Sequence, residues 1–447
     1  MFASSLRWIY GSPPRLLMLG FAAIIAVGTL LLGLPAATVA GETTSVIDAL
    51  FTATSAACVT GLVTLDTGTH WTLFGQLVIL ALIQVGGLGF MTMATLFAFF
   101  LKRRISLRER LILQEALNQT SMEGIVRLVR RVIVYALVIE LTGAILLSVR
   151  FLLDMSPGRA IYYGIFHSVS FFNNAGFDIM GQYRSLTDYA GDPAVNIVSM
   201  LLIVLGGLGF IVLSDLIDWR RTRRLTLHSK VVLATTGFLI GFGALVIFVF
   251  EYTNSASMQP LGFGEKLLAA FMQSVAPRTA GVNSLDIASL RQATQFFLVL
   301  LMFVGASPGS TGGGIKTTTF AALIGAVIAM IRGKDDVVLF RYRLAQERVY
   351  KALTITLLSL TLILLATMLL SATEDHHFLK LLFEVTSAFS TVGMTMGLTL
   401  ELTMFGKIVI IVLMFIGRIG PLTMGYALGR KPGRVLFRYA EGKIIIG

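Results

Sequence analysis

Residues Phe383 to Thr395 read FEVTSAFSTVGMT. This stretch begins as a short apolar helix and ends in Thr391-Val392-Gly393, where glycine allows the backbone to turn its carbonyls inward. A helix that crosses a membrane needs about 20 apolar residues. Some ten residues before a turn therefore predict a re-entrant helix, which enters the membrane and returns to the same side.

The same pattern occurs four times in the chain. A phenylalanine is followed ten residues later by a glycine in the pairs Phe51 and Gly61, Phe166 and Gly176, Phe271 and Gly281, Phe383 and Gly393. A serine recurs on the body of each segment, at Ser55, Ser170, Ser274 and Ser387. Four matches at nearly equal spacing indicate an internal repeat.

Four glycine turns around one axis would form a ring of backbone carbonyls able to replace the hydration shell of a cation. Non-helical backbone survives at membrane depth only where it is buried in protein or lines a water-filled cavity. The alternative is that these glycines only pack or cap helices. We expect the following residues to form a cation-selective filter: Val59, Thr60, Gly61, Asn174, Ala175, Gly176, Thr279, Ala280, Gly281, Thr391, Val392 and Gly393.

Composition and charge place this chain in a membrane. Of 447 residues 55% are hydrophobic and 13% are charged, which is typical of an integral membrane protein. The net charge of +12 is concentrated between or beyond apolar spans, as the positive-inside rule predicts for cytoplasmic segments. We therefore expect no nucleic-acid partner. The single cysteine, Cys58, excludes an intrachain disulfide framework.

We predict an all-α integral membrane protein of four span–re-entrant pore helix–span units, with eight transmembrane helices around a central cation pore and both termini in the cytoplasm. The predicted spans are Leu16–Leu34, Trp71–Leu101, Val132–Leu153, Val195–Trp219, Val231–Phe250, Gln295–Ile331, Ala352–Leu370 and Met404–Leu428. The predicted units are repeat 1 (1–101), a basic helical cytoplasmic linker (102–131), repeat 2 (132–224), repeat 3 (225–331), a cytoplasmic linker with repeat 4 (332–430), and a cytoplasmic tail (431–447). Cleavage of the first span as a signal peptide is the alternative at the N-terminus.

The returning spans share a glycine motif, VGGLGF at 85–90 and LGGLGF at 205–210. Small residues let membrane helices approach closely, so we interpret this motif as helix packing. The third returning span differs, because it contains Pro308 among glycines and cannot continue as a helix. The broken segment consists of Gly305, Ala306, Ser307, Pro308, Gly309, Ser310, Thr311, Gly312, Gly313 and Gly314. Its Ile315-Lys316 continuation does not match a phosphate-binding loop.

Two cations, Lys316 and Arg418, lie within returning spans, where a charge costs roughly 2.5–3.5 kcal/mol and marks a functional candidate. Two roles remain open for Arg418: an electrostatic barrier to cations, or a brace bonded to free carbonyls of the broken segment. Arg278, next to Thr279, is expected to brace the filter from behind through carbonyl bonds. Asp66 and Asp178 are expected to concentrate cations at the outer mouth.

With these features the chain resembles the superfamily of K+ transporters that includes the Trk, Ktr and HKT proteins, over essentially its whole length. It looks most like the membrane subunits of bacterial Ktr systems. The resemblance implies a multi-pass protein of the bacterial plasma membrane that forms a homodimer, contacts membrane lipid and binds a cytosolic KtrA-like ring of nucleotide-binding subunits. It also implies that the broken segment, with Lys316 and Arg418, is an intramembrane gate. Glycine at all four filter positions is similar to K+-selective members.

The predicted function is K+ uptake through a gated pore, with K+ as the bound ion at the filter and no cofactor in this chain. Alternatives are a Na+- or H+-coupled K+ symporter and a Na+-permeable member of the same superfamily. An enzyme is not expected, because the histidines show no metal-ligand spacing and no nucleophile motif is present.

Overall fold

The structure is a computed structural model and describes residues 13–40, 42–89, 92, 111 and 125–428. Within these ranges the chain forms fifteen α-helices and one two-stranded hairpin, β1 (Val338–Leu339) and β2 (Tyr342–Arg343). The predicted all-α membrane architecture is confirmed. The basic linker 102–131 lies largely outside the described residues, although α7 already begins at Ile125; the tail 431–447 lies entirely outside them.

Each predicted unit opens with one long apolar helix. These four helices are α2 (Pro13–Leu32), α7 (Ile125–Phe151), α11 (Leu227–Glu251) and α15 (Gln346–Thr373). In the described part of the chain they are the four single helices long and apolar enough to cross a membrane. Two bent helix pairs raise this number to six if each pair is one span. The count of eight spans therefore stays a prediction.

A shorter helix follows each long helix and ends at one of the four glycine turns. These are α3 (Val46–Ala57), α8 (Pro157–Phe172), α12 (Phe263–Val275) and α16 (Phe378–Ser390). Their bounds agree to within three residues with the re-entrant segments predicted from the sequence, which are Ser45–Val59, Ala160–Phe172, Gly264–Ala276 and Phe378–Ser390. Each packs against the long helix that precedes it, so that span and short helix form one hairpin in every unit.

The third helix of every unit ends at or near its glycine motif, and here the prediction of continuous spans was wrong. Helix α4 (Leu73–Leu88) ends before Gly89. Helices α9 (Pro193–Leu208) and α10 (Phe210–Thr222) meet at 100° around Gly209, and α17 (Met404–Ile419) and α18 (Pro421–Leu428) meet at 91° around Gly420. The predicted break in repeat 3 is confirmed, since residues 304–316 separate α13 (Gln292–Phe303) from α14 (Thr317–Ile331).

The breaks share one backbone conformation. Gly89, Gly209 and Gly420 have φ of 81°, 92° and 90° with ψ of 133°, 142° and 135°, a region that favours glycine. The other glycines of the motif do pack closely, as predicted. A Cβ added at Gly86, Gly206 or Gly417 would lie 2.0, 1.8 or 1.8 Å from a carbonyl at the end of the short helix in the same unit. The motif thus combines helix packing with a bend.

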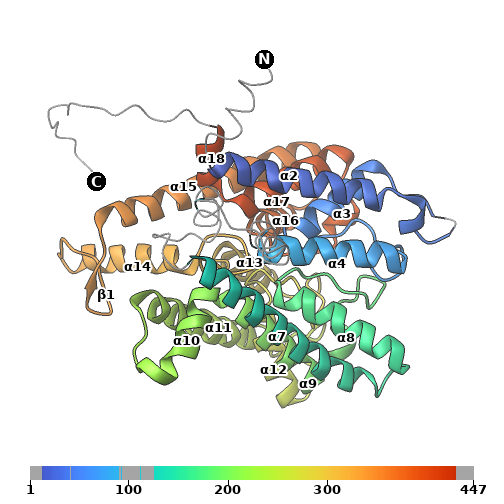
Figure 1. Ribbon diagram of the computed structural model, residues 1–447, viewed down its shortest axis with the longest axis horizontal. Coiled ribbons are helices and arrows are strands. Elements are labelled where there is room, and N and C mark those ends of the chain that lie inside the picture. Colours follow the sequence, from blue (N-terminus) through green and yellow to red (C-terminus); the bar gives the residue numbers. More distant parts are fainter. Residues whose placement is uncertain (1–12, 41, 90–91, 93–110, 112–124, 429–447) are drawn as a thin grey trace.

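The four units close into a ring. Helix α4 packs on α8, α9 on α12, α13 on α16, and α17 on α3, so that each returning helix contacts the short helix of the next unit. Figure 1 shows the result: α2, α3, α16 and α17, from opposite ends of the chain, lie together on one side, and α7, α8, α9 and α12 lie on the other. The short helices and their turns consequently meet at the centre.

Candidate functional site

The four glycine tripeptides adopt one backbone conformation. In each, the first residue has positive φ although it is not glycine: Val59, Asn174, Thr279 and Thr391 lie between 51° and 67°. The glycines Gly61, Gly176, Gly281 and Gly393 have φ of 95°, 71°, 65° and 93°. A left-handed conformation costs an ordinary residue roughly 1–2 kcal/mol. Four repetitions of this strain in one ring indicate a shape that function requires.

The tripeptides form a closed ring, in which each glycine faces a carbonyl of the next unit. A Cβ added at Gly61 would lie 2.5 Å from the Ala175 oxygen, and one at Gly176 would lie 2.7 Å from the Ala280 oxygen. A Cβ at Gly281 would lie 2.5 Å from the Val392 oxygen, and one at Gly393 would lie 2.1 Å from the Thr60 oxygen. The last contact returns to the first unit, so we call these twelve residues the glycine ring.

Serines of the short helices support the ring in two units. The N–H groups of Gly61 and Gly393 donate to Ser55 Oγ and Ser387 Oγ, both at 3.1 Å. In the second unit Ser170 Oγ donates instead to the Phe177 carbonyl at 2.5 Å. Ser274 does not belong to this set, because its hydroxyl donates to the Ile240 carbonyl on α11 at 2.8 Å. Ala276 occupies the serine position in this unit, because its carbonyl accepts the Ala280 N–H as the carbonyl of Ser170 accepts the Ala175 N–H. The serine predicted for repeat 3 was therefore two residues out of register.

Residues 305–314, which we call the Gly-rich loop, lie directly against the glycine ring. A Cβ at Gly312 would lie 2.0 Å from Thr279 Oγ1, and one at Gly313 would lie 2.2 Å from Thr391 Oγ1. Thr311 Oγ1 donates to Asn174 Oδ1 at 3.0 Å. The loop thus touches the first residue of three of the four tripeptides.

Broken helices satisfy each other's free backbone groups at this point. A helix that ends leaves its last carbonyls without intrahelical donors. The carbonyls of Gly206 and Gly207 at the end of α9 accept from the N–H groups of Thr311 (3.3 Å) and Ser307 (3.0 Å). In return, the Phe210 N–H donates to the Gly309 carbonyl at 2.9 Å. The Gly-rich loop is therefore tied to the bend of the preceding unit.

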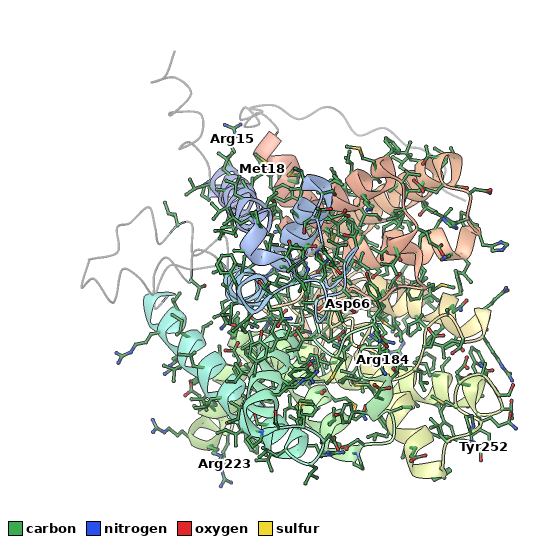
Figure 2. The ribbon with its side chains drawn as sticks, turned by 90° about the vertical axis from the view of Figure 1, so that its right-hand side faces the viewer. Arg15, Met18, Asp66, Arg184, Arg223 and Tyr252 are labelled. Carbon is green, nitrogen blue, oxygen red and sulfur yellow. The ribbon has the colours of Figure 1, made fainter. Side chains whose placement is uncertain are left out.

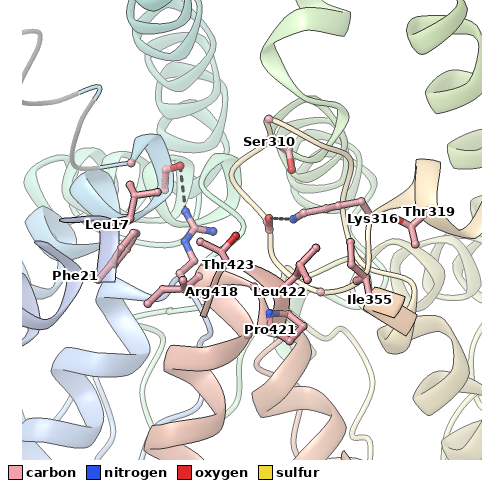
Figure 3. Close-up of a pocket in the computed structure, with 18 of the residues that line it drawn as sticks. Leu17, Phe21, Ser310, Lys316, Thr319, Ile355, Arg418, Pro421, Leu422 and Thr423 are labelled. Atoms are coloured by element: carbon pink, nitrogen blue, oxygen red, sulfur yellow. Dashed lines mark hydrogen bonds between the residues drawn. The ribbon is translucent and has the colours of Figure 1, made fainter. Parts of the chain in front are cut away.

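Arg418 and Lys316 hold the opposite side of the loop. Arg418 donates to the carbonyls of Thr311 and Gly86, and to that of Gly87 at 3.3 Å. Lys316 Nζ donates to the carbonyls of Gly312 (2.8 Å) and Gly313 (3.2 Å). Figure 3 shows both cations at a cavity of about 240 Å³ between the loop and the α17–α18 bend. The bonds predicted for a bracing Arg418 are present; its role as a barrier stays a prediction.

The bracing role predicted for the Arg278 side chain was wrong. The Arg278 guanidinium is buried and donates to Thr236 Oγ1 at 3.2 Å, whereas its own carbonyl accepts from Asn174 Nδ2 at 3.1 Å. Arg278 thus contributes its backbone, not its side chain, to the ring. Asp66 is also buried, and its carboxylate accepts N–H bonds from Gly68, Thr69 and Tyr183. It joins two loops near the centre of the view in Figure 2. That Asp66 and Asp178 concentrate cations at the outer mouth stays a prediction.

Sequence reasoning missed two buried carboxylates on intramembrane helices. Glu140 on α7 accepts from Gln84 Nε2 at 3.1 Å and from Asn173 Nδ2 at 3.0 Å. Asn173 directly precedes the glycine ring. The second carboxylate, Glu384 on α16, accepts from two threonine hydroxyls. An acidic residue inside an apolar predicted helix was the available signal, and it applies to both positions.

Comparison with known proteins agrees with this geometry. The sequence profile of the TrkH family, described as a cation transport protein, matches residues 20–430. The chain belongs to the TrkH family of cation transport proteins. It is 45% identical to the Ktr system potassium uptake protein B of Bacillus subtilis, over 99% of this chain and 98% of that protein. It is 42% identical to the potassium/sodium uptake protein NtpJ of Enterococcus hirae, over 98% and 97%.

A solved structure supports the fold. The crystal structure of the potassium transporter TrkH from Vibrio parahaemolyticus superposes with a TM-score of 0.73 at 18% identity and covers 92% of this chain and 83% of that chain. Membership of the family, together with the apolar helices, makes the chain an integral membrane transport protein. These relatives are named as transporters and not as enzymes.

Proposed function

We propose that this protein takes up K+ through a pore whose selectivity filter is the glycine ring, in the plasma membrane of a bacterium. The observation that carries the proposal is the closure of the ring, in which four glycines each face a carbonyl of the next unit. Carbonyl oxygens around one axis replace the hydration shell of a desolvated cation. A membrane potential of 100 mV contributes about 2.3 kcal/mol per charge, so uptake needs no chemistry in this chain.

In this proposal the Gly-rich loop is the gate of the pore. It lies against the glycine ring through Gly312 and Gly313, opposite Thr279 and Thr391, whose hydroxyls have no hydrogen-bond partner among the described residues. An ion leaving the ring would have to pass the loop. Arg418 and Lys316 hold its carbonyls, so that their release would let it move.

The proposal includes the partners and the orientation of the chain. The Bacillus subtilis relative is named as protein B of a Ktr system, a name that implies further components. We propose a homodimer in contact with membrane lipid and a cytosolic KtrA-like nucleotide-binding ring, with both termini of the chain in the cytoplasm.

A coupled or less selective transporter is the second candidate. The Enterococcus hirae relative is named for both potassium and sodium. Coupled carriers use intramembrane ionisable groups, and Glu140 is buried beside Asn173, which directly precedes one tripeptide. A strict Na+ or H+ requirement for K+ flux would favour this candidate over a simple pore.

The test is a flux measurement in liposomes with wild type and Gly176→Ser side by side. A serine adds a Cβ 2.7 Å from the Ala280 carbonyl, so we expect K+-preferring flux in wild type and a loss of that preference in the variant. The purified partner ring is added in a parallel series to open a closed pore. K+ preference that is unaffected by Gly176→Ser would contradict a filter at the ring.

A further inference from the structure

Behind the glycine ring, each short helix carries a polar side chain at the same position. The four residues are Thr52, His167, Gln273 and Glu384, and none has any exposed surface. Three of them stand three residues before the serines Ser55, Ser170 and Ser387. All four units therefore place a buried polar group behind the glycine turn, but every unit uses a different residue.

Three of these residues bind the loop that leaves the ring. His167 Nε2 accepts from the Ile179 N–H at 3.4 Å, and Gln273 Nε2 donates to the Leu285 carbonyl at 3.1 Å. Thr52 Oγ1 has no partner among the described residues. Glu384 is the acidic member of the set, and both of its carboxylate oxygens bind this loop.

Glu384 holds the segment immediately after Gly393. Its Oε2 accepts from Thr395 Oγ1 at 2.7 Å, and its Oε1 accepts from Thr399 Oγ1. Thr395 lies two residues past Gly393, and its hydroxyl also accepts the Gly397 N–H at 3.0 Å. One carboxylate thus fixes both ends of the five-residue turn that leads away from the ring.

The far end of the segment that follows Gly393 is also bound to α16. Glu401 accepts from Lys380 Nζ, one turn before Glu384 on α16. This hydrogen bond holds the pKa of Glu401 below its usual range. The pair is largely exposed and contributes little. The buried clamp at Glu384 therefore dominates the position of the segment.

We infer that Glu384 is a positioning residue for ion selectivity, which holds Thr395 and thereby the backbone of Gly393 in the glycine ring. This inference rests on the proposed filter. Gly393 is the most tightly placed of the four glycines, since a Cβ there would lie 2.1 Å from the Thr60 carbonyl. A small displacement of the segment after Gly393 is therefore transmitted directly to the carbonyl of the neighbouring unit.

The test compares Glu384→Gln with Glu374→Gln in the full-length protein with its partner ring. Both are buried glutamates that accept from threonine, because Glu374 binds the Thr403 N–H at 3.1 Å and Thr403 Oγ1 at 2.5 Å. Glu374, however, caps α17 away from the ring. The readouts are the K+-to-Na+ flux ratio in liposomes and the melting temperature.

We expect Glu384→Gln to lower the flux ratio roughly three- to tenfold, since one of the two accepting carboxylate oxygens is replaced by an NH2 group that can only donate. Glu374→Gln should lower the melting temperature and leave the ratio unchanged. Thr395→Val keeps the shape of the side chain, removes one partner of Glu384 and should reproduce the fall in ratio. It also replaces Glu384→Gln if that variant does not fold.

The outcomes distinguish a failure of the proposed filter from a failure of the role inferred for Glu384. If Gly393→Ser, assayed in parallel, retains the wild-type ratio, the filter itself is misplaced. If Gly393→Ser loses the ratio while Glu384→Gln and Thr395→Val keep it, the filter stands and the role of Glu384 is overturned. If Glu384→Gln and Glu374→Gln lower the ratio equally, the effect is one of general stability and the inference is again overturned.

Discussion

Alanine substitution of the four ring glycines should damage selectivity in a graded order that the structure fixes. An added Cβ would lie 2.1 Å from a carbonyl oxygen at Gly393, 2.5 Å at Gly61 and Gly281, and 2.7 Å at Gly176. Contacts shorter than 3.0 Å force a displacement, which amounts to about 0.9 Å at Gly393 and about 0.3 Å at Gly176. Every position also has positive φ, so no variant is free of strain.

The expected magnitudes follow from these displacements. At Gly176 the φ of 71° is accessible to alanine at roughly 1–2 kcal/mol, so Gly176→Ala should lower the K+-to-Na+ flux ratio about tenfold. At Gly393 the φ of 93° and the larger displacement should abolish the preference. Gly61→Ala and Gly281→Ala should lie between these two variants.

The assay is ratiometric flux in liposomes, with membrane expression as a check on folding. Gly241→Ala is the matched control, because Gly241 lies inside α11, has no atom within 4 Å of an added Cβ and has an ordinary helical φ. It should leave the ratio unchanged. Equal effects at all four positions, or a larger effect at Gly176 than at Gly393, would refute the ring geometry as the source of selectivity.

Substitutions at three further positions test the surroundings of the ring. Arg418→Ala should raise basal flux, measured as leak, and lower thermal stability, measured as the melting temperature. Arg418→Lys separates the two roles of the arginine. Low basal flux with a lowered melting temperature would indicate a charge barrier, and raised basal flux would indicate a brace. Gly312→Ala should raise basal flux without the partner ring, because its Cβ would lie 2.0 Å from Thr279 Oγ1 and push the loop away; unchanged flux would count against a gate. Glu140→Gln should keep K+ flux in a simple pore; loss of flux or of its dependence on Na+ or pH would support the coupled alternative.

The short helices and the glycine ring were predictable because their signals are local and repeated. A phenylalanine, a run of apolar residues and a glycine at fixed spacing define each unit without any tertiary contact. The broken third span was predictable for the same reason, since Pro308 among glycines excludes a helix. What the sequence did not yield is how these pieces touch, such as the bond between Thr311 and Asn174.

The bends at Gly209 and Gly420 escaped prediction because glycine inside an apolar helix has two explanations. A glycine needed for close packing and a glycine needed for a positive φ look the same in the sequence, and we interpreted the motif as helix packing alone. A comparison of all four units would have pointed to the bend, since Pro308 stands where the others have Gly89, Gly209 or Gly420. The register of Ser274 was missed because the stretch from Gln273 to Gly281 is one residue shorter than its counterpart from His167 to Gly176.

The same comparison of the four units shows which position of the repeat Arg418 occupies. Arg418 follows Gly417, as Gly87 follows Gly86, Gly207 follows Gly206 and Ala306 follows Gly305. Three units thus have a small residue at this position and the fourth has an arginine. Its side chain crosses to the carbonyls of Gly86 and Gly87 in the first unit and of Thr311 in the third.

A ring of four identical subunits would place four such arginines around its axis, and their mutual repulsion would oppose any cation below the filter. A single chain with four diverged units can place one arginine there and leave the other three positions small. That one guanidinium satisfies the free carbonyls of the first returning helix and at the same time holds the Gly-rich loop of the third unit. Four diverged units in one chain would therefore allow the proposed fourfold filter to be combined with the proposed gate on one side of the ring, and the substitutions at Arg418 and Gly312 test this combination.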